Sequence, residues 1–310
     1  MSTNIELPNQ TVVKDYTILR KLNSGGFSFV YMAKSNITGE IVAIKEYMPK
    51  RLKLREKGTV VYINNKDTKK IFDLNFTLFI KEMETISKIK HKNIVNIVDF
   101  FKANNTAYIV TPYEFGTPLI NKVFYIKRNK TMFSEELLVK IFIGILEAIK
   151  ELHDNGIFHL DLKPENIWLR PNNEIIILDF GTSLLKKDVR QGVSLLTQGY
   201  AAIEQHDRYN KPLKIDYWTD YYGIGATMFK LMTHDNPEPA INLVKNNKKN
   251  DIYSKSIINY HYKIMNAVDK LLDIKVSDRK LIDINKMIND LKNIKSFKNK
   301  NLDMLELILD

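Results

Sequence analysis

The chain has 310 residues, of which 44% are hydrophobic and 27% charged, as in a soluble globular protein with two lobes or two small domains. It contains no cysteine, which excludes disulfides and thiolate–metal sites, and we expect a cytoplasmic location. The net charge of +11 comes from scattered lysines without interleaved aromatic residues, so no nucleic-acid binding is expected. The charge could equally attract an acidic protein partner.

The distribution of apolar residues argues against secretion and membrane insertion. Residues 1–14 lack the cationic stretch and apolar core of a secretion signal. The most apolar run, residues 137–152, carries four charged side chains and is too short to cross a bilayer. We therefore expect no membrane span.

The first third of the chain is predicted to form short strands and one helix. Apolar runs and alternation indicate the strands, which are separated by a Ser-Gly-Gly turn at 24–26 and by a hairpin connection at 36–39. Apolar residues at helical spacing indicate the helix. The predicted strands are 16–22, 29–34, 41–45, 94–101 and 107–111, and the predicted helix is 79–89.

After Pro112 the pattern becomes mainly helical. Residues 115–118, Phe-Gly-Thr-Pro, are expected to form a connector. Ser134 is the expected N-cap of a long helix that ends at Asn155-Gly156. The remaining predicted elements are strands at 167–169 and 175–178 and helices at 219–232 and 260–274. The pattern predicts an α+β fold with a small β-rich lobe and a larger helical lobe.

Four short sequence motifs, which occur in a fixed order, indicate the chemistry of the protein. They are Leu-Asn-Ser-Gly-Gly-Phe-Ser-Phe-Val at 22–30, Val-Ala-Ile-Lys at 42–45, His-Leu-Asp-Leu-Lys-Pro-Glu-Asn at 159–166 and Asp-Phe-Gly at 179–181. Phosphoryl transfer requires a positioned triphosphate, a bound metal ion and a carboxylate that orients the attacking hydroxyl. In this order the strings resemble the protein kinase family over residues 16–291. Looser strings at 45–49, 105–108, 199–205 and 218–227 resemble bacterial eukaryotic-like (Hanks-type) Ser/Thr kinases.

The resemblance implies the bilobal protein-kinase fold and a division of the chain. Residues 1–15 would be an N-terminal extension and 16–111 the N-lobe, with an insert at 49–74. Residues 112–117 would be the hinge, 118–295 the C-lobe and 296–310 a C-terminal helix or tail.

The resemblance also assigns roles to the catalytic residues. Lys45 would hold the α- and β-phosphates of ATP and pair with Glu82, for which Glu84 is the rival. Asp161 would orient the substrate hydroxyl, and Lys163 would neutralise charge near the γ-phosphate. Asn166 and Asp179 would hold Mg²⁺ or Mn²⁺. The residues expected to bind the nucleotide are Asn23, Ser24, Gly25, Gly26, Phe27, Ser28, Val30, Ala43, Lys45, Thr111 and Tyr113.

Lys163 and Thr197 imply a serine or threonine acceptor, because Ser/Thr kinases of this family typically carry them at these two positions. Glu204 stands where the family has the glutamate of Ala-Pro-Glu, and it is expected to pair with Arg279. Asp220 is expected to anchor the backbone of the catalytic loop. The candidate positions of the activation segment are Thr182, Ser194 and Thr197.

Two departures from the family pattern concern the glycine loop and the catalytic loop. The pattern Gly-x-Gly-x-x-Gly is present as Asn23-x-Gly25-x-x-Ser28, which could weaken ATP binding without abolishing it. Leu160 replaces the arginine that grips a phosphorylated loop in many kinases. We therefore predict that activity does not depend on phosphorylation of the activation loop.

Two segments have open roles. The basic insert at 49–74, with a strand-like stretch at 59–63, could be a regulatory or docking flap, but a solvated loop is the plainer interpretation. The apolar spacing at 302–309 predicts a helix that packs back onto the large lobe.

The leading hypothesis is an active Ser/Thr kinase that modifies a protein substrate, with a homodimer as a route to autophosphorylation. The alternative is a pseudokinase that acts as a nucleotide-binding scaffold or partner-binding module, which only the glycine loop and Leu160 support. A kinase of small molecules is disfavoured because the activation segment is complete through Glu204.

Overall fold

The computed structural model describes residues 6–26, 28–49, 55, 58–63, 65–180, 184–185, 196–206 and 214–294. Several predicted positions lie outside these residues, namely Phe27, Thr182, Ser194 and the tail 296–310. Glu82 is described only as part of a helix backbone.

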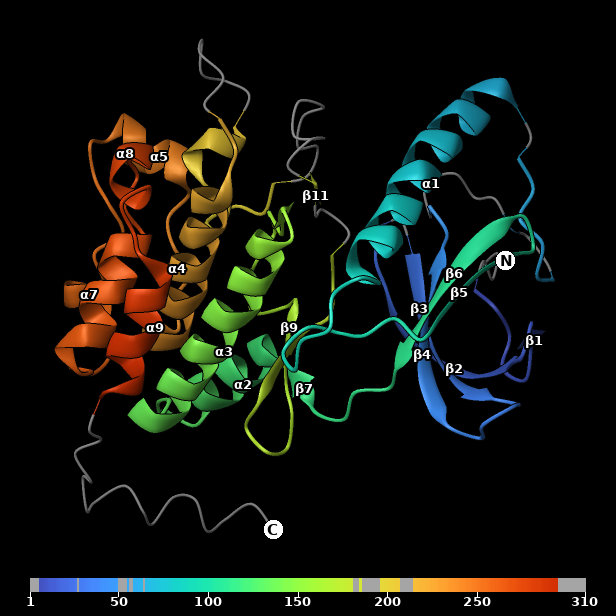
Figure 1. Cartoon of the computed structure of the whole chain (residues 1–310), viewed down its shortest axis with the longest axis horizontal. Coiled ribbons are helices and arrows are strands. Elements are labelled where there is room, and N and C mark those ends of the chain that lie inside the picture. Colours follow the sequence, from blue (N-terminus) through green and yellow to red (C-terminus); the bar gives the residue numbers. More distant parts are fainter. Residues whose placement is uncertain are drawn as a thin grey trace.

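The first lobe is a six-stranded antiparallel sheet with one long helix beside it (Figure 1). The strand order is β1-β2-β3-β4-β6-β5. The elements are β1 (Val12–Val13), β2 (Tyr16–Ser24), β3 (Ser28–Ser35), β4 (Ile41–Tyr47), α1 (Lys66–Ile86), β5 (Asp99–Ala103) and β6 (Thr106–Pro112).

The second lobe is mainly helical and carries short strands on the side that faces the sheet (Figure 1). Its strands are β7 (Thr117–Pro118), β8 (Ile157–Phe158), β9 (Ile167–Leu169), β10 (Ile175–Ile177) and β11 (Leu184–Leu185). Its helices are α2 (Leu119–Arg128), α3 (Glu135–Asp154), the 3₁₀ turn η3 (Ile203–Gln205), α4 (Tyr217–Thr233), α5 (Ala240–Lys245), α6 (Ile252–Lys255), α7 (Tyr262–Leu271), α8 (Val276–Arg279) and α9 (Ile284–Lys292). The predicted α+β bilobal fold is confirmed.

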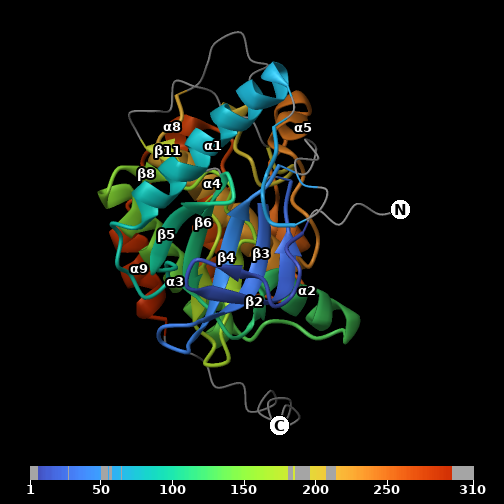
Figure 2. The same ribbon diagram turned by 90° about the vertical axis from the view of Figure 1, so that its right-hand side faces the viewer.

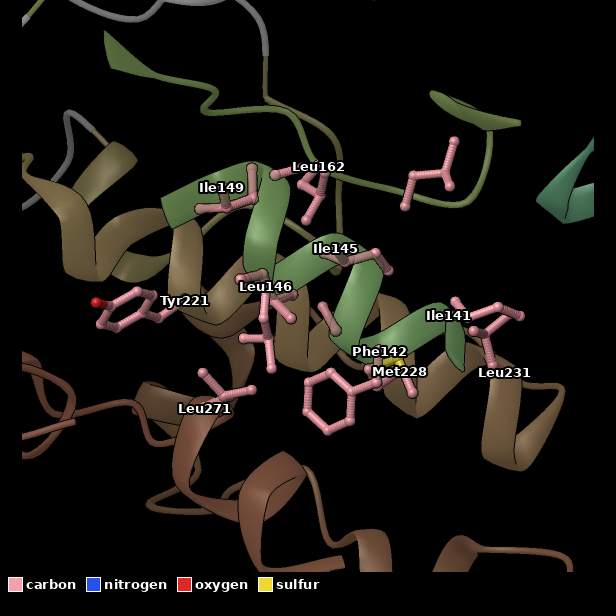
Figure 3. Packing of buried hydrophobic residues seen from close by; sticks show 14 of the residues in the cluster. Ile141, Phe142, Ile145, Leu146, Ile149, Leu162, Tyr221, Met228, Leu231 and Leu271 are labelled. Atoms are coloured by element: carbon pink, nitrogen blue, oxygen red, sulfur yellow. The ribbon is translucent and has the colours of Figure 1, made fainter. Parts of the chain in front are cut away.

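Each lobe has its own hydrophobic core. In the helical lobe α3 packs against α4 and α9, and Leu162 of the catalytic loop reaches into the same hydrophobic cluster (Figure 3). Gly223 of α4 faces Leu162, and a Cβ at Gly223 would lie 3.3 Å from the Leu162 Cβ. The catalytic loop is therefore seated directly on the core of the large lobe.

Helix α1 begins at Lys66, more than three turns before the start of the helix predicted at 79–89. Asn65 caps α1 by accepting a hydrogen bond from the Thr68 amide at 2.7 Å. Phe72 and Phe76 pack their rings 5.0 and 5.5 Å from the ring of Tyr47, and α1 lies beside the sheet in both views (Figure 2). The last part of the predicted insert, residues 66–74, is therefore helical, because its aromatic face is buried against β4.

Two strand predictions in this region are wrong. Residues 59–63 form no strand; instead the Val61 amide donates to the Asn104 carbonyl at 2.9 Å, and Asn105 donates to the Val61 carbonyl at 3.1 Å. Strand β5 begins only at Asp99, and Ile94 makes a single parallel bridge to Ile177. The other predicted strands, and the helix that Ser134 caps, are present with small shifts at their ends.

Candidate active site

The catalytic loop connects β8 to β9 and is fixed by one buried carboxylate. The Asp220 side chain accepts the His159 amide at 2.9 Å and the Leu160 amide at 2.8 Å, and it also contacts His153 Nε2 at 2.8 Å. Leu160 has a φ of 65°, a left-handed conformation that is unfavourable for leucine, so these bonds hold a strained backbone. Burial, the largest single effect, would raise the pKa of Asp220, but the hydrogen bonds from His153 and the Leu160 amide and the charges of His153 and His159 together lower it.

Asp161 lies at the centre of a dense hydrogen-bond cluster. Lys163 Nζ donates to its Oδ2 at 2.7 Å, and Thr197 Oγ1 donates to its Oδ1 at 2.6 Å. Lys163 also donates to Thr197 Oγ1 at 2.8 Å, and Asn166 Nδ2 donates to the Asp161 carbonyl at 2.8 Å. The cluster holds a carboxylate in one orientation with an ammonium beside it, which suits the orientation of an attacking hydroxyl.

Asn166 and Asp179 lie on two adjoining stretches of backbone. The Leu178 amide donates to the Asn166 carbonyl at 3.2 Å, which places Asp179 next to the catalytic loop. Because the Asn166 amide nitrogen donates to Asp161, its oxygen is left as the ligand atom, and 53% of the Asp179 side chain is exposed. One carboxylate and one amide oxygen are hard donors that fit Mg²⁺ when substrate phosphates and water complete the shell.

Lys45 reaches from the sheet to Asp179, with its Nζ 3.0 Å from Asp179 Oδ1. In the sheet Lys45 is paired with Val30, and Ala43 is paired with Thr111. Directly opposed residues share a face, and side chains two apart along a strand do too, so Val30, Ala43, Lys45 and Thr111 line one face. Tyr113 follows, its amide donating to the Ile41 carbonyl at 3.4 Å. This face is the predicted nucleotide surface.

The glycine loop connects β2 to β3. The Gly25 amide donates to the Ser28 carbonyl at 2.9 Å, and the Ser24 amide donates to Asn23 Oδ1 at 2.7 Å. A Cβ at Gly26 would meet nothing within 4 Å, so the loop has open space beside it. The loop therefore leaves room for a phosphate despite its single matching glycine.

Of the two candidate partners of Lys45, Glu84 is exposed on α1. It therefore fits the role poorly. Glu82 lies on the same helix, and its side chain is outside the described residues. The Lys45–Glu82 pairing stays a prediction.

The connector between the lobes is fastened by residues that the sequence analysis did not single out. Arg170 donates from Nε and Nη2 to the two carboxylate oxygens of Glu114, at 2.8 and 2.9 Å. Gly116 has a φ of 134°, and a Cβ there would lie 2.2 Å from the Leu169 carbonyl oxygen, so only glycine fits. The sequence signal that could have pointed to this contact was Glu114, a charged residue two positions before Gly116 in the predicted hinge.

The end of the activation segment is held by two buried groups. Arg279 Nη2 lies 2.5 Å from both carboxylate oxygens of Glu204, and both side chains are fully buried. Gln205, which the sequence analysis missed, accepts the Ala202 amide at 2.9 Å and donates to the Leu160 carbonyl at 2.8 Å. Gln205 therefore connects the end of the activation segment with the catalytic loop. No motif signalled this role, because it depends on the three-dimensional approach of the two loops.

Within the part of the chain that the structure describes, no helix is both long enough and apolar enough to cross a membrane.

Comparisons with known proteins agree with this geometry. The chain is 29% identical over 246 residues to "CBL-interacting protein kinase 26" of Oryza sativa subsp. japonica, covering 77% of the chain and 44% of that protein. It is 29% identical over 226 residues to "CBL-interacting serine/threonine-protein kinase 19" of Arabidopsis thaliana, covering 71% of the chain and 41% of that protein. The chain thus spans less than half the length of these two relatives.

The fold is also that of a solved structure, "PpkA-294 apo form", with a TM-score of 0.77 and 24% identity over 93% of this chain and 99% of that one. A family model described as "Protein kinase domain" matches residues 16–293. The chain therefore belongs to the protein kinase domain family.

Proposed function

We propose that this chain is a serine/threonine protein kinase that transfers the γ-phosphate of ATP to a Ser or Thr hydroxyl of a protein. The observation that carries the proposal is the Asp161–Lys163–Thr197 cluster, which stands beside the Lys45–Asp179 pair. A pseudokinase needs no such cluster, because binding alone does not require an oriented carboxylate.

In the proposed reaction the chain's own residues position the reactants. The acceptor hydroxyl donates its hydrogen bond to Asp161, so its oxygen attacks the γ-phosphorus while the bond from that phosphorus to the ADP oxygen breaks. Asp161 receives the proton, and Lys163 offsets charge near the transferred group. Lys45 holds the α- and β-phosphates. A metal ion bound by Asn166 and Asp179 would neutralise charge on the phosphate oxygens.

The acceptor preference is supported by Thr197, which bonds to both Asp161 and Lys163. A cytoplasmic location and autophosphorylation within a homodimer remain predictions from the sequence.

The test is transfer from γ-labelled ATP in the presence of Mg²⁺ or Mn²⁺, alone and with a basic protein substrate. Incorporation by the wild type should be lost in Lys45→Met, whose fold is checked by circular dichroism. Retained incorporation in Lys45→Met would mean that the activity belongs to a contaminant. ATP binding without incorporation in the wild type would establish the pseudokinase alternative.

We also propose that the activation segment needs no phosphate to be held in place. Leu160 cannot grip a phosphate, and Gln205 already bonds the segment to the Leu160 carbonyl without one. The double variant Thr182→Ala/Ser194→Ala should therefore keep the activity of the wild type within about twofold, which corresponds to about 0.4 kcal/mol of activation free energy. The measurement is the initial rate on a peptide substrate. Abolished activity in a folded double variant would show that a loop phosphate is required.

A further inference from the structure

Arg55 is the one described member of a basic run whose neighbours Lys50, Arg51, Lys53 and Lys57 lie outside the described residues. Its side chain is fully buried, although arginine is among the residues least often found inside proteins. The expectation of a solvated loop at 49–74 is therefore wrong at Arg55, and also at Val61, which is 1% exposed.

The buried guanidinium pairs with Glu46 of β4. Arg55 Nη1 lies 3.1 Å from Glu46 Oε2, and Nη2 lies 2.5 Å from Oε1. Tyr31 and Tyr108 donate their hydroxyls to the two Glu46 oxygens at 3.0 and 2.8 Å. Each carboxylate oxygen of Glu46 thus accepts two hydrogen bonds. Burial of the Glu46 and Arg55 charges is tolerated because they are paired and hydrogen-bonded.

Protonation states agree with this arrangement. Burial and the Glu46 charge raise the pKa of both tyrosines, which keeps them as hydroxyl donors. Burial, the largest single effect, would lower the pKa of Arg55, but the hydrogen bond to Glu46 together with the Glu46 charge and the two tyrosines raises it.

The network lies directly behind the predicted phosphate-binding lysine. Side chains alternate along β4, so Lys45 and Tyr47 lie on one face and Glu46 on the other. Tyr47 contacts α1 through Phe72, Phe76 and Phe79, and it donates its hydroxyl to the Phe72 carbonyl at 3.0 Å. Strand β4 therefore contacts Arg55 on its outer face and α1 on its inner face.

The chain between β4 and α1 is fastened at two described points. Arg55 binds β4, and Val61 bonds to Asn104 and Asn105 of the β5–β6 turn. Helix α1 is capped by Asn65, only four residues after Val61. Because only four residues lead from Val61 to Asn65, the start of α1 must lie close to the Val61 anchor.

We propose that Arg55 is a positioning residue, whose ion pair with Glu46 sets α1, and with it Glu82, against Lys45. This inference rests on the proposed function, in which Lys45 holds ATP and pairs with Glu82. The insert then has a structural role inside the fold and is not merely a solvated loop.

The test compares Arg55→Met with the double variant Arg55→Met/Glu46→Gln. The single variant leaves a buried carboxylate without its cation, so its Tm falls. The double variant removes that charge. The oxygen of the new side-chain amide accepts from one tyrosine hydroxyl and its NH₂ group donates to the other, so the Tm recovers. If Arg55 positions α1, kcat stays about 10- to 100-fold low in the double variant with a smaller change in the KM for ATP. Amide hydrogens of α1 also exchange faster than in the wild type, whereas those of α3 do not change.

The control is Lys14→Met, which removes the partly exposed Lys14–Asp99 pair from the same lobe and should change none of these readouts. A double variant with wild-type kcat and wild-type exchange in α1 would overturn the proposal and leave the pair a purely structural one. If the wild type transfers no phosphate, the proposed function fails, and exchange in α1 still decides whether Arg55 positions the helix.

Discussion

Replacement of Asp161 by Asn is expected to lower kcat by about 10²- to 10⁴-fold, the usual contribution of a positioned acid or base. Asparagine has nearly the size of aspartate, and its single amide oxygen can still accept from Lys163, which lies 2.7 Å from the carboxylate. Its NH₂ group can donate to Thr197 Oγ1, which lies 2.6 Å from the carboxylate. Asparagine cannot take the proton of the acceptor hydroxyl. The loss is therefore expected in the transfer step, and the affinity for ATP should remain that of the wild type.

The measurement is single-turnover transfer together with equilibrium binding of an ATP analogue. Asp235→Asn is a matched control, because Asp235 is 67% exposed and pairs only with the surface residue Lys127 in the described structure. That variant should transfer phosphate at the wild-type rate. Equal loss of ATP binding and of transfer in Asp161→Asn would contradict the role given to this carboxylate.

The largest loss of stability is expected for Arg279→Met. The variant leaves Glu204 charged, fully buried and without its cation, and broken buried pairs of this kind cost about 3–5 kcal/mol. Arg279 also donates to the Trp218 carbonyl at 3.1 Å and to the Ile274 carbonyl at 3.2 Å, so these acceptors lose a partner as well. At about 2–4 °C per kcal/mol for a domain of this size class, Tm should fall by about 6–20 °C.

Thermal unfolding followed by circular dichroism measures this effect. Lys249→Met removes a pair whose lysine is half exposed, Lys249–Asp269, and should cost less than about 1 kcal/mol. The double variant Arg279→Met/Glu204→Gln should recover part of the loss, because it buries no unpaired charge. An Arg279→Met protein as stable as Lys249→Met would show that the buried pair contributes little.

Loss of the Glu204–Arg279 pair should also reach the active site. Gln205 is adjacent to Glu204 and bonds to the Leu160 carbonyl, and Leu160 precedes Asp161. The end of the activation segment, the catalytic loop and α4 are therefore joined by short buried contacts. This arrangement provides a physical reason why the segment can be held without a phosphate.

The sequence alone determined the class of fold and predicted the residues of the candidate site. The apolar patterns behind the predicted helices that begin at Ser134 and at 219–232 are strong because α3 buries a continuous face and α4 is buried along almost its whole length; Ser134 also signals its own cap. The candidate residues could be predicted because phosphoryl transfer requires given residue types at fixed spacing along local segments. They are Lys45, Asp161, Lys163, Asn166 and Asp179. Local patterns of this kind are readable without a structure.

The tertiary structure decided what depends on partners distant in the chain. The first half of α1 was missed because its aromatic residues, Phe72 and Phe76, pack against Tyr47 of β4. Tyr47 precedes the insert in the chain, so the local sequence does not reveal this contact. Gln205 and Arg55 were missed because a polar side chain in a loop looks solvated until its buried acceptor is known. Arg55 could be distinguished from the other basic residues of the insert only once folding had brought it to Glu46.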